Sequence, residues 1–388
     1  MEALARRGFG VEVLCGPLLQ LGHDVDLSAY LAARGLSFGL RGNDLRDIAP
    51  SGALPRAPLH ANLELRGVLV TILWGPTLPR PVTNDQHRDF LQLFDEACAR
   101  NRPDIVVSFG GGSLTREIFR RAKAFGASTV FPVHNLRYND RATFADVDAV
   151  LVASRFAAEH YRLRLGLRCA VLPNLVDFQR ARALDRQPRY VVFVNPTVEK
   201  GLGIFARIAD ELGRTRSDVP FLVVEGDGTE ADVAACGLDL RAHANVFFHE
   251  HTSDPRRFWR VARICILPSL VDENQPLVAI EAMINGVPVI GSNRGGIQET
   301  LGYAGSVLPI PDCLSPTAYS LPAAEAATHW VEAILEHWDS PDVYERASRR
   351  ALIEVRRWAP ESLEPRYERF FAMVGLNGGP PDTDDPNS

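Results

Sequence analysis

Short apolar runs alternate with longer amphipathic stretches along most of the chain. Such runs, rich in valine, isoleucine and phenylalanine, are typical of buried strands; they are VEVLCG, VLVTILWG, DIVVSFGGG, STVFPVHN, AVLVAS, RYVVFVNP, FLVVEG, NVFFHE, ICILPS and VPVIGS. Strands that alternate with helices predict an α/β fold with parallel sheets and helical crossovers. Ligands of open parallel sheets bind beyond the carboxyl ends of the strands, so the residues at those ends are the functional candidates.

The alternation breaks between Pro173 and Arg189, where the chain is polar, arginine-rich and without a strand-like run. A break of this kind predicts a connection between two domains. The expected parts are two Rossmann-like domains, a linker between them, a C-terminal helix that crosses back to the first domain, and a disordered Gly/Pro/Asp-rich tail. Their boundaries are 1–178 and 189–357 for the domains, 179–188 for the linker, 358–374 for the helix and 375–388 for the tail.

Composition places few limits on function. The chain has 388 residues, of which 46% are hydrophobic, so it is long enough for two cores. A net charge of −6 argues against a general nucleic-acid binder. Six cysteines without a CxxC pair suggest reduced thiols. With no apolar run of about 18 residues and no visible signal peptide, the sequence predicts a protein of the cytoplasm or of the inner face of a membrane.

The segment Val271–Glu299 carries the strongest chemical pattern. A strand-like run is followed by a polar break, and a helix is expected to begin near Pro276, capped by Asp272 or Asn274. The helix N-terminus attracts anions or hydroxyl groups through its free amides. Glu281, in the second turn, can accept two hydrogen bonds from a vicinal diol such as a ribose.

The linked features of this segment resemble the donor site of the retaining GT-B glycosyltransferases of family 4. The resemblance is carried by Glu273 and Glu281 at their spacing, by AMINGVPVI, and by the glycine pair in GGIQE. It implies that Glu281 binds the ribose and that Glu273 lies beside the donor sugar. It also implies donor contacts from the backbone of Gln275 and Leu277, and from Gly295 and Gly296.

A second segment, FVNPTVEKG, resembles the family's loop in which an arginine and a lysine hold the donor diphosphate. Lys200 matches the lysine, and its ammonium would stabilise the charge that grows on the leaving group. Asn195 stands where the family has arginine, which removes a bidentate charged contact. Arg294 is the candidate for supplying the lost charge. Gly226 and Gly228 resemble the family's second glycine turn near the nucleotide, although a purely structural turn is an open alternative.

In the first domain, His134 ends an apolar strand where the family carries a histidine near the reacting sugar. It is expected to orient the acceptor, with a simple strand-ending role as the alternative. Gly110–Gly112 is a candidate for part of the acceptor site. Pro173 and Asn174 match the family's PNGVD element and are expected to position the domain connection.

Three other patterns have simpler explanations. The pairs Asp24/Asp26 and Asp146/Asp148 look like metal-binding DxD motifs, but they are expected to be solvated. His249 and His251 lack further zinc ligands, so a loop near the nucleobase is expected there. The arginine-rich stretch 155–168 is expected to be a solvated helix face, with contact to acidic lipid as an alternative.

The chain begins within a predicted first helix, ahead of which the resemblance implies a strand and a glycine-rich loop. Neither is present in the sequence, and a start assigned downstream of the true one is the favoured interpretation.

Taken together, the sequence predicts a retaining glycosyltransferase that moves a sugar, of hexose type, from a UDP- or GDP-linked donor without a divalent metal. The expected acceptor is a carbohydrate, a lipid-linked molecule or a small molecule. One alternative is a nucleotide-sugar-binding partner subunit impaired in catalysis, suggested by Asn195 and the absent strand. A Rossmann oxidoreductase is the other, against which no GxGxxG follows an early strand.

Overall fold

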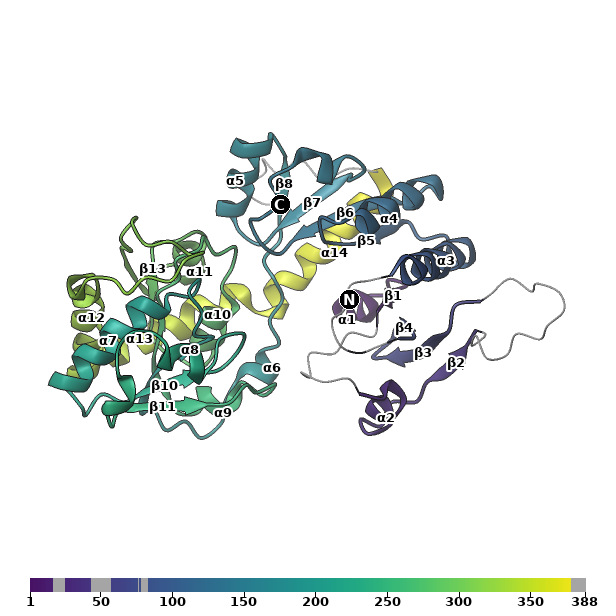
Figure 1. Ribbon diagram of the computed structural model, residues 1–388. Helices are drawn as coiled ribbons and strands as arrows, with labels where there is room; N and C mark the ends of the chain where they lie inside the picture. The colour runs from purple at the N-terminus through teal and green to yellow at the C-terminus, as the bar shows by residue number, and fades with distance from the viewer. Residues whose placement is uncertain (17–24, 43–56, 76, 78–82, 378–388) are drawn as a thin grey trace. The chain divides into compact units, whose positions relative to one another are not determined.

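The computed structural model describes residues 1–16, 25–42, 57–75, 77 and 83–377 (Figure 1). The chain divides into two compact units. The first consists of Met1–Pro132, Asp140–Val150 and Tyr367–Ser388, and the second of Val133–Asn139 and Leu151–Arg366. The boundaries expected from the sequence, at 178 and 189, stay a prediction.

The first unit opens with a mixed sheet in the order β1-β4-β3-β2. β1 is parallel to β4, whereas β3 is antiparallel to both β2 and β4, so the prediction of parallel sheets alone was wrong here. Arg66 and Gly67, both at positive φ, form the two-residue turn between β3 and β4, which is the geometry that closes a tight hairpin. The elements are α1 (Glu2–Arg6), β1 (Glu12–Cys15), α2 (Leu27–Ala32), β2 (Gly39–Arg41), β3 (His60–Leu65) and β4 (Val68–Leu73).

A second sheet has the order β5-β6-β7-β8. Its elements and their helices are α3 (Asn84–Asn101), β5 (Ile105–Val107), α4 (Ser113–Ala124), β6 (Ser128–Val133), η2 (Arg141–Phe144), β7 (Ala149–Val152), α5 (Arg155–Leu165) and β8 (Cys169–Val171). Asp148 accepts hydrogen bonds from Thr129 and pairs with Lys123 of α4 at 2.6 Å. Asp148 is therefore a structural residue rather than a solvated one.

The second unit contains a six-stranded sheet in the order β11-β10-β9-β12-β13-β14, with every pair parallel. Its strands are β9 (Tyr190–Val194), β10 (Phe221–Val224), β11 (Val246–His249), β12 (Ala262–Leu267), β13 (Val289–Ser292) and β14 (Ser306–Leu308). The strand order reverses between β9 and β12. In an open parallel sheet, this reversal marks the place beyond the strand ends where a ligand binds.

Both faces of this sheet are buried under helices. Val191 and Phe193 of β9 pack on one face with α7, while Val192 packs on the other face with α10, as alternation along a strand requires. The helices are α6 (Phe178–Ala181), α7 (Leu202–Thr215), α8 (Glu230–Ala234), η3 (Leu240–Ala242), α9 (Arg256–Trp259), α10 (Leu277–Ile284), α11 (Ile297–Leu301), η4 (Ala324–Ala327), α12 (Thr328–Asp339), α13 (Pro341–Glu354) and η5 (Val355–Trp358).

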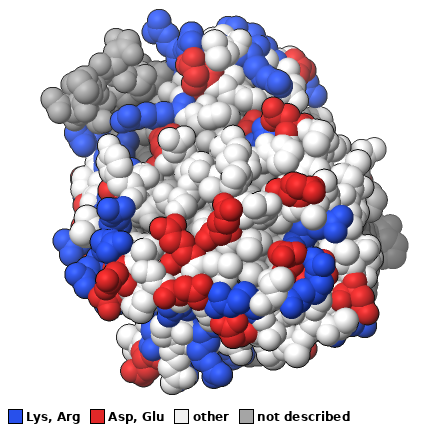
Figure 2. Space-filling model, turned by 90° about the vertical axis from the view of Figure 1, so that its left-hand side faces the viewer, with Lys and Arg blue, Asp and Glu red and all other residues white. Residues whose placement is uncertain are grey.

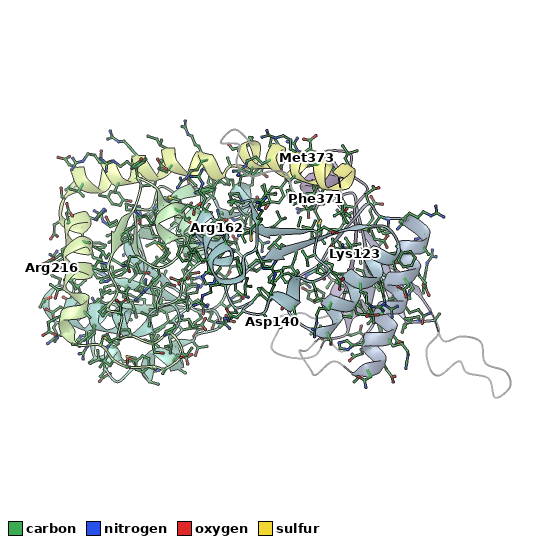
Figure 3. The ribbon with its side chains drawn as sticks, turned by 90° about the horizontal axis from the view of Figure 1, so that it is seen from above. Lys123, Asp140, Arg162, Arg216, Phe371 and Met373 are labelled. Carbon is green, nitrogen blue, oxygen red and sulfur yellow. The ribbon has the colours of Figure 1, made fainter. Side chains whose placement is uncertain are left out.

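The last helix, α14 (Pro360–Asn377), carries Phe371 and Met373 (Figure 3). It includes 375–377, which were predicted to belong to the tail, and the rest of the predicted tail lies outside the described residues. Among the helices described, none is long and apolar enough to cross a membrane. On the face shown in Figure 2, acidic and basic side chains are interspersed rather than gathered into a basic surface.

We expect Phe205→Ala to destabilise the second unit strongly. Phe205 is fully buried on α7, with its ring 4.7 Å from that of Phe193 and 5.8 Å from that of Phe221. The cavity should lower the free energy of unfolding by about 3–5 kcal/mol, measured by urea denaturation followed by circular dichroism. Tyr303→Ala, at a position 87% exposed, is the control, and it should change stability by less than about 0.5 kcal/mol. Equal effects of the two variants would contradict the predicted packing role.

Candidate functional site

Two loops meet where the strand order reverses, one after β9 and one after β12. The Leu270 amide donates to the Glu199 carbonyl at 2.9 Å, which joins the loops directly. Gly201 lies at φ +86, and a Cβ there would come within 1.9 Å of the Pro268 carbonyl oxygen. Glycine is thus required at this position both for its backbone conformation and for the approach of the second loop.

Lys200 and Glu273 form an ion pair across the two loops. The Lys200 Nζ lies 2.6 Å from Glu273 Oε1, and the Ser269 hydroxyl donates to the same oxygen. The Lys200 side chain is 34% exposed and that of Glu273 is 14% exposed. The pair is therefore held in place while its ammonium remains accessible to a ligand.

The glycine pair packs against the backbone of the Glu273 loop. Glu273 forms a parallel bridge with Gly295, and the Gly296 amide donates to the Glu273 carbonyl at 2.6 Å. A Cβ on Gly295 would lie 2.4 Å from the Glu273 carbonyl oxygen, and one on Gly296 would lie 2.1 Å from that of Asn274. The glycine pair therefore permits the close approach of the loop that carries Glu273.

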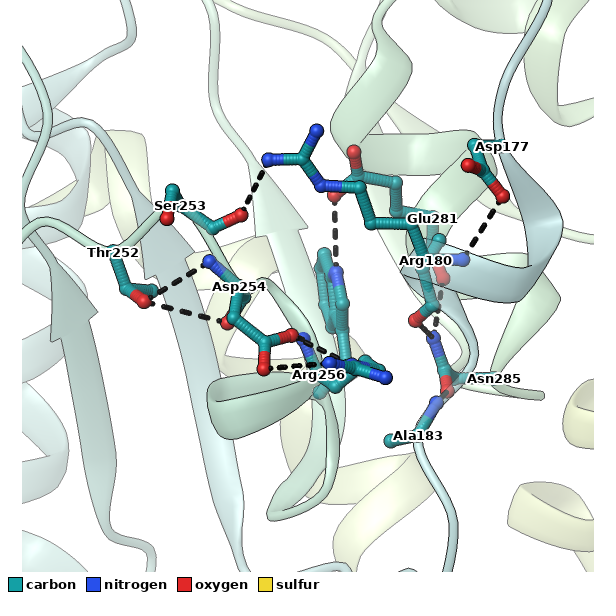
Figure 4. A network of polar contacts seen from close by, with 11 residues as sticks. Asp177, Arg180, Ala183, Thr252, Ser253, Asp254, Arg256, Glu281 and Asn285 are labelled. Carbon is teal, nitrogen blue, oxygen red and sulfur yellow. Dashed lines mark hydrogen bonds and ion pairs between the residues drawn. The ribbon is translucent and has the colours of Figure 1, made fainter. Parts of the chain in front are cut away.

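Glu281 lies on α10 with its carboxylate largely buried. Burial raises its pKa, while a hydrogen bond from Trp259 Nε1, at 3.1 Å to Oε2, and the charge of Arg180 act in the opposite direction (Figure 4). No hydrogen bond from the described residues reaches the other carboxylate oxygen, Oε1. The site therefore holds an oriented carboxylate with an acceptor position left for a ligand.

The start of α10 differs from the expectation in one respect. Pro276 precedes the helix, and no side chain caps it, so the predicted cap by Asp272 or Asn274 was wrong. Asn274 instead bridges two other segments, because its Oδ1 accepts from Ser154 Oγ at 3.1 Å and its Nδ2 donates to the Val133 carbonyl at 2.9 Å. The side chain that could have capped the helix fixes the position of the loop.

Gln275 and Leu277 stand at this same helix start. Gln275 is 7% exposed, and its Oε1 accepts from the Asn174 amide at 2.7 Å, which gives Asn174 a positioning contact. Its Nε2 is buried without a partner in the described part of the chain. Leu277 is 41% exposed in the first turn. A ligand at the helix start would meet the exposed side chain of Leu277.

Asn195 holds the second glycine turn. It adopts φ +61, and its Oδ1 accepts from the Gly228 amide at 2.9 Å. A Cβ on Gly226 would lie 2.9 Å from the Asn195 side chain, and one on Gly228 would lie 2.5 Å from the Pro196 carbonyl. Gly226 and Gly228 are therefore required by packing against the Asn195 loop.

Arg294 was predicted to supply the charge that Asn195 lacks. Its Nη2 lies 3.0 Å from Asp312 Oδ1 and 3.4 Å from the Ile310 carbonyl. Asp312 is 96% exposed, so the pair is screened by solvent. The guanidinium is directed to the segment after β14, and its role toward a donor stays a prediction.

His134 directly follows β6 and is exposed. The carbonyl of the preceding Val133 accepts from Asn274, and Arg137 forms an ion pair with Glu199, the neighbour of Lys200. The segment that carries His134 is thus bonded to both site loops. Glu299, at the end of the GGIQE motif, accepts from the first amides of α5 and so caps that helix, a contact that its sequence position alone did not reveal.

The remaining candidates lie in structural roles or outside the described residues. Asp26 caps α2, and Asp24 lies outside the described part of the chain. His249 shares a hydrogen bond with the Glu250 carbonyl, and no group of residues suited to a metal occurs among those described. On α5, Arg162 pairs with Glu159. Gly110 adopts φ +104 in the loop before α4.

Residues 188–321, which carry Lys200, Glu273 and Glu281, match the family described as "Glycosyl transferases group 1". This part of the chain is therefore similar to the glycosyl transferases group 1 family. The chain is also 29% identical over 158 residues to a phosphatidyl-myo-inositol mannosyltransferase of Mycolicibacterium smegmatis. It is 26% identical over 219 residues to a lipopolysaccharide 1,2-N-acetylglucosaminetransferase of Salmonella typhimurium. The predicted resemblance to this family is confirmed over residues 188–321.

These matches cover 38% and 50% of this chain, and only 41% and 56% of the two relatives. The fold is supported over a longer stretch by sucrose-phosphate synthase from Thermosynechococcus elongatus. That structure is similar over 97% of this chain and 91% of its own, with a TM-score of 0.69 and 16% identity. The predicted GT-B fold is therefore confirmed.

We expect Asn195→Ala to loosen the turn at Gly228. The variant loses the hydrogen bond to the Gly228 amide and places alanine at a positive φ, which together should cost about 1–2 kcal/mol of local stability. Hydrogen exchange at the Gly228 amide should accelerate by about tenfold. Asn293→Ala, which removes a similar bond to the Ile310 amide, is the matched control. Exchange at Gly228 that is unchanged by Asn195→Ala would refute the assigned role.

Proposed function

We propose that the protein transfers a sugar from a nucleoside diphosphate sugar to an acceptor with retention of configuration and without a metal in the chemical step. The carrying observation is that Lys200 and Glu273 form one ion pair at the β9–β12 reversal, with Glu281 on the helix that follows. The arrangement supports the proposal, because a cation suited to a diphosphate and two carboxylates suited to hydroxyl groups lie beyond the carboxyl ends of parallel strands.

The nucleoside is proposed to lie at Glu281. Its Oε2 is bonded to Trp259, and Oε1 is left to accept hydrogen bonds from the ribose hydroxyls. Since the carboxylate is largely buried, hydrogen bonds made there are poorly screened by water. The backbone of Gln275 and Leu277 and the glycine pair Gly295–Gly296 are proposed to hold the phosphate and sugar portion.

Lys200 is proposed to neutralise the departing diphosphate. The bond between the sugar's anomeric carbon and the diphosphate oxygen breaks as the acceptor oxygen bonds to that carbon on the same face. The acceptor's proton passes to the departing phosphate oxygen. Charge on the diphosphate grows during this step, so the ammonium stabilises the transition state more than the ground state. Glu273 faces the sugar and orients Lys200, and His134 positions the acceptor.

Of the three acceptor classes that the sequence predicts, we favour a lipid-linked acceptor. Both relatives bear names that refer to such molecules, a phosphatidyl-myo-inositol and a lipopolysaccharide. The support is one of analogy within the family.

A second candidate is a subunit that binds the donor without turning it over. Asn195 contributes no charge and is engaged with the Gly228 amide, and Lys200 is engaged with Glu273. Nucleotide binding without product formation, with acceptors of carbohydrate, lipid-linked and small-molecule types, would favour this candidate.

A panel of UDP, GDP, ADP and their sugars should identify the donor by its effect on thermal unfolding. A nucleotide present at a hundred times its dissociation constant stabilises the folded protein by about 2.7 kcal/mol. We expect one base to raise the melting temperature clearly more than the others. The absence of a shift with every nucleotide would count against the whole proposal.

Two substitutions should distinguish the residue that binds the diphosphate from the residue that binds the nucleoside. We expect Lys200→Ala to weaken binding of the nucleoside diphosphate by about tenfold or more, with little effect on the nucleoside monophosphate. Glu281→Gln should weaken both, because the ribose is common to them. Isothermal titration calorimetry gives the affinities, and Lys123→Ala, which breaks the pair with Asp148, is the control. Equal losses for both ligands in Lys200→Ala would contradict the assignment of the lysine to the diphosphate.

A further inference from the structure

Arg180 lies on α6, which is joined to α10 near Glu281 because Asn285 Nδ2 donates to the carbonyls of Ala181 at 2.9 Å and of Glu281 at 2.8 Å (Figure 4). The Arg180 amide is bonded to Asp177 Oδ1 at 3.0 Å, and its Nη2 donates to the Ser253 carbonyl at 2.7 Å (Figure 4). The guanidinium thus spans from α6 to the loop that follows β11. Its Nε and Nη1 have no partner among the residues described.

The guanidinium of Arg180 is a positive charge near the Glu281 carboxylate. Trp259 is a neutral donor, and Cys265 of β12 is a buried thiol whose pKa is raised by burial and by Glu281 itself. The other charged or titratable side chains on nearby elements include Asp177, which accepts from the Arg180 amide, and Arg256, which is paired with Asp254. Arg257 also lies on α9, and the ring of His249 lies near Phe258 of the same helix. Burial raises the pKa of Glu281, and the charge of Arg180 acts in the opposite direction.

A carboxylate that receives a ribose must remain ionised. If it were protonated, it would present a donor to hydroxyl groups and lose acceptor capacity. Burial favours the protonated form, and a nearby cation favours the charged one. Contact with the Ser253 carbonyl anchors the guanidinium near the carboxylate, and its exposed N–H groups remain available to the nucleotide.

We propose that Arg180 is a positioning residue of the nucleoside subsite, which keeps Glu281 ionised and so able to accept the ribose hydroxyls. The inference rests on the proposed function for its ligand, but the effect of Arg180 on Glu281 exists without any ligand. Arg180 could not be identified from the sequence, because it lies in the arginine-rich connection after Pro173. Nothing in that segment distinguishes it from the neighbouring arginines.

The first experiment uses the ligand-free full chain. The Trp259 indole N–H, bonded to Glu281, reports the protonation of that carboxylate by NMR; it is one of five tryptophans and is assigned with Trp259→Phe. In Arg180→Gln, the titration midpoint of this signal should rise by about half a pH unit or more. Arg180→Lys should restore the midpoint. Arg256→Gln, which removes an equal charge from the neighbouring pair, should leave it in place.

The second experiment measures nucleotide affinity against pH. With the nucleotide identified by the thermal panel, Arg180→Gln should weaken binding several-fold at about pH 5, and the deficit should narrow as the pH rises to about 8. The sign follows because loss of the cation raises the pKa of Glu281, so the binding form is lost at a higher pH as acid is added. Arg180→Lys should bind with nearly the wild-type profile.

The outcomes separate the two proposals. An indole midpoint that Arg180→Gln leaves unchanged, a signal that titrates in neither protein, or an equal shift in Arg256→Gln would overturn the role of Arg180. A shifted midpoint in a protein that binds no nucleotide would support the electrostatic role of Arg180 and refute the proposed function. A pH-independent loss of nucleotide affinity in Arg180→Gln would assign Arg180 to a direct contact instead.

Discussion

The close contact between the backbone at Glu273 and the Gly295–Gly296 pair is the constraint on which the rest of the site depends. The carbonyl of Glu273 accepts from the Gly296 amide, and neither glycine has space for a Cβ. This contact fixes the loop after β12, and that loop carries Glu273 toward Lys200 and leads into α10 with Glu281. Lys200 and Glu273 can form their ion pair because Gly295 and Gly296 have no side chains that would push the Glu273 loop away.

The sequence contained enough information for the α/β pattern and for the site in the second unit. Each apolar run named in the sequence analysis contains a strand of the structure. The hairpin of β3 and β4 was not anticipated, because its turn is formed by Arg66 and Gly67 rather than by a more familiar pair such as Asn-Gly. The short strands β2, β8 and β14 were also missed.

Pairwise contacts between distant segments were the other limit. Sequence motifs were enough to propose Glu273, Lys200 and the glycine pair. The hydrogen bond from Trp259 to Glu281 joins α9 to α10, and no local sequence pattern predicts it. Asn274 shows the same limit in another form. Its position before a helix suggested a cap, whereas its amide is satisfied by Val133 and Ser154. When a polar side chain has several possible hydrogen-bond partners, the tertiary structure is needed to identify the one that it uses.

The ion pair of Lys200 and Glu273 also affects how the site treats anions that are not donors. In the resting protein, the lysine already has a counter-ion at 2.6 Å, and Asn195 adds no further positive charge. A bare phosphate would have to compete with the carboxylate for the same ammonium and would gain nothing at Glu281. A molecule that joins an anion to sugar and ribose hydroxyls brings its own donors to both carboxylates. Under the proposed function, the internal counter-ion thereby acts as a filter, which favours nucleoside diphosphate sugars over inorganic anions.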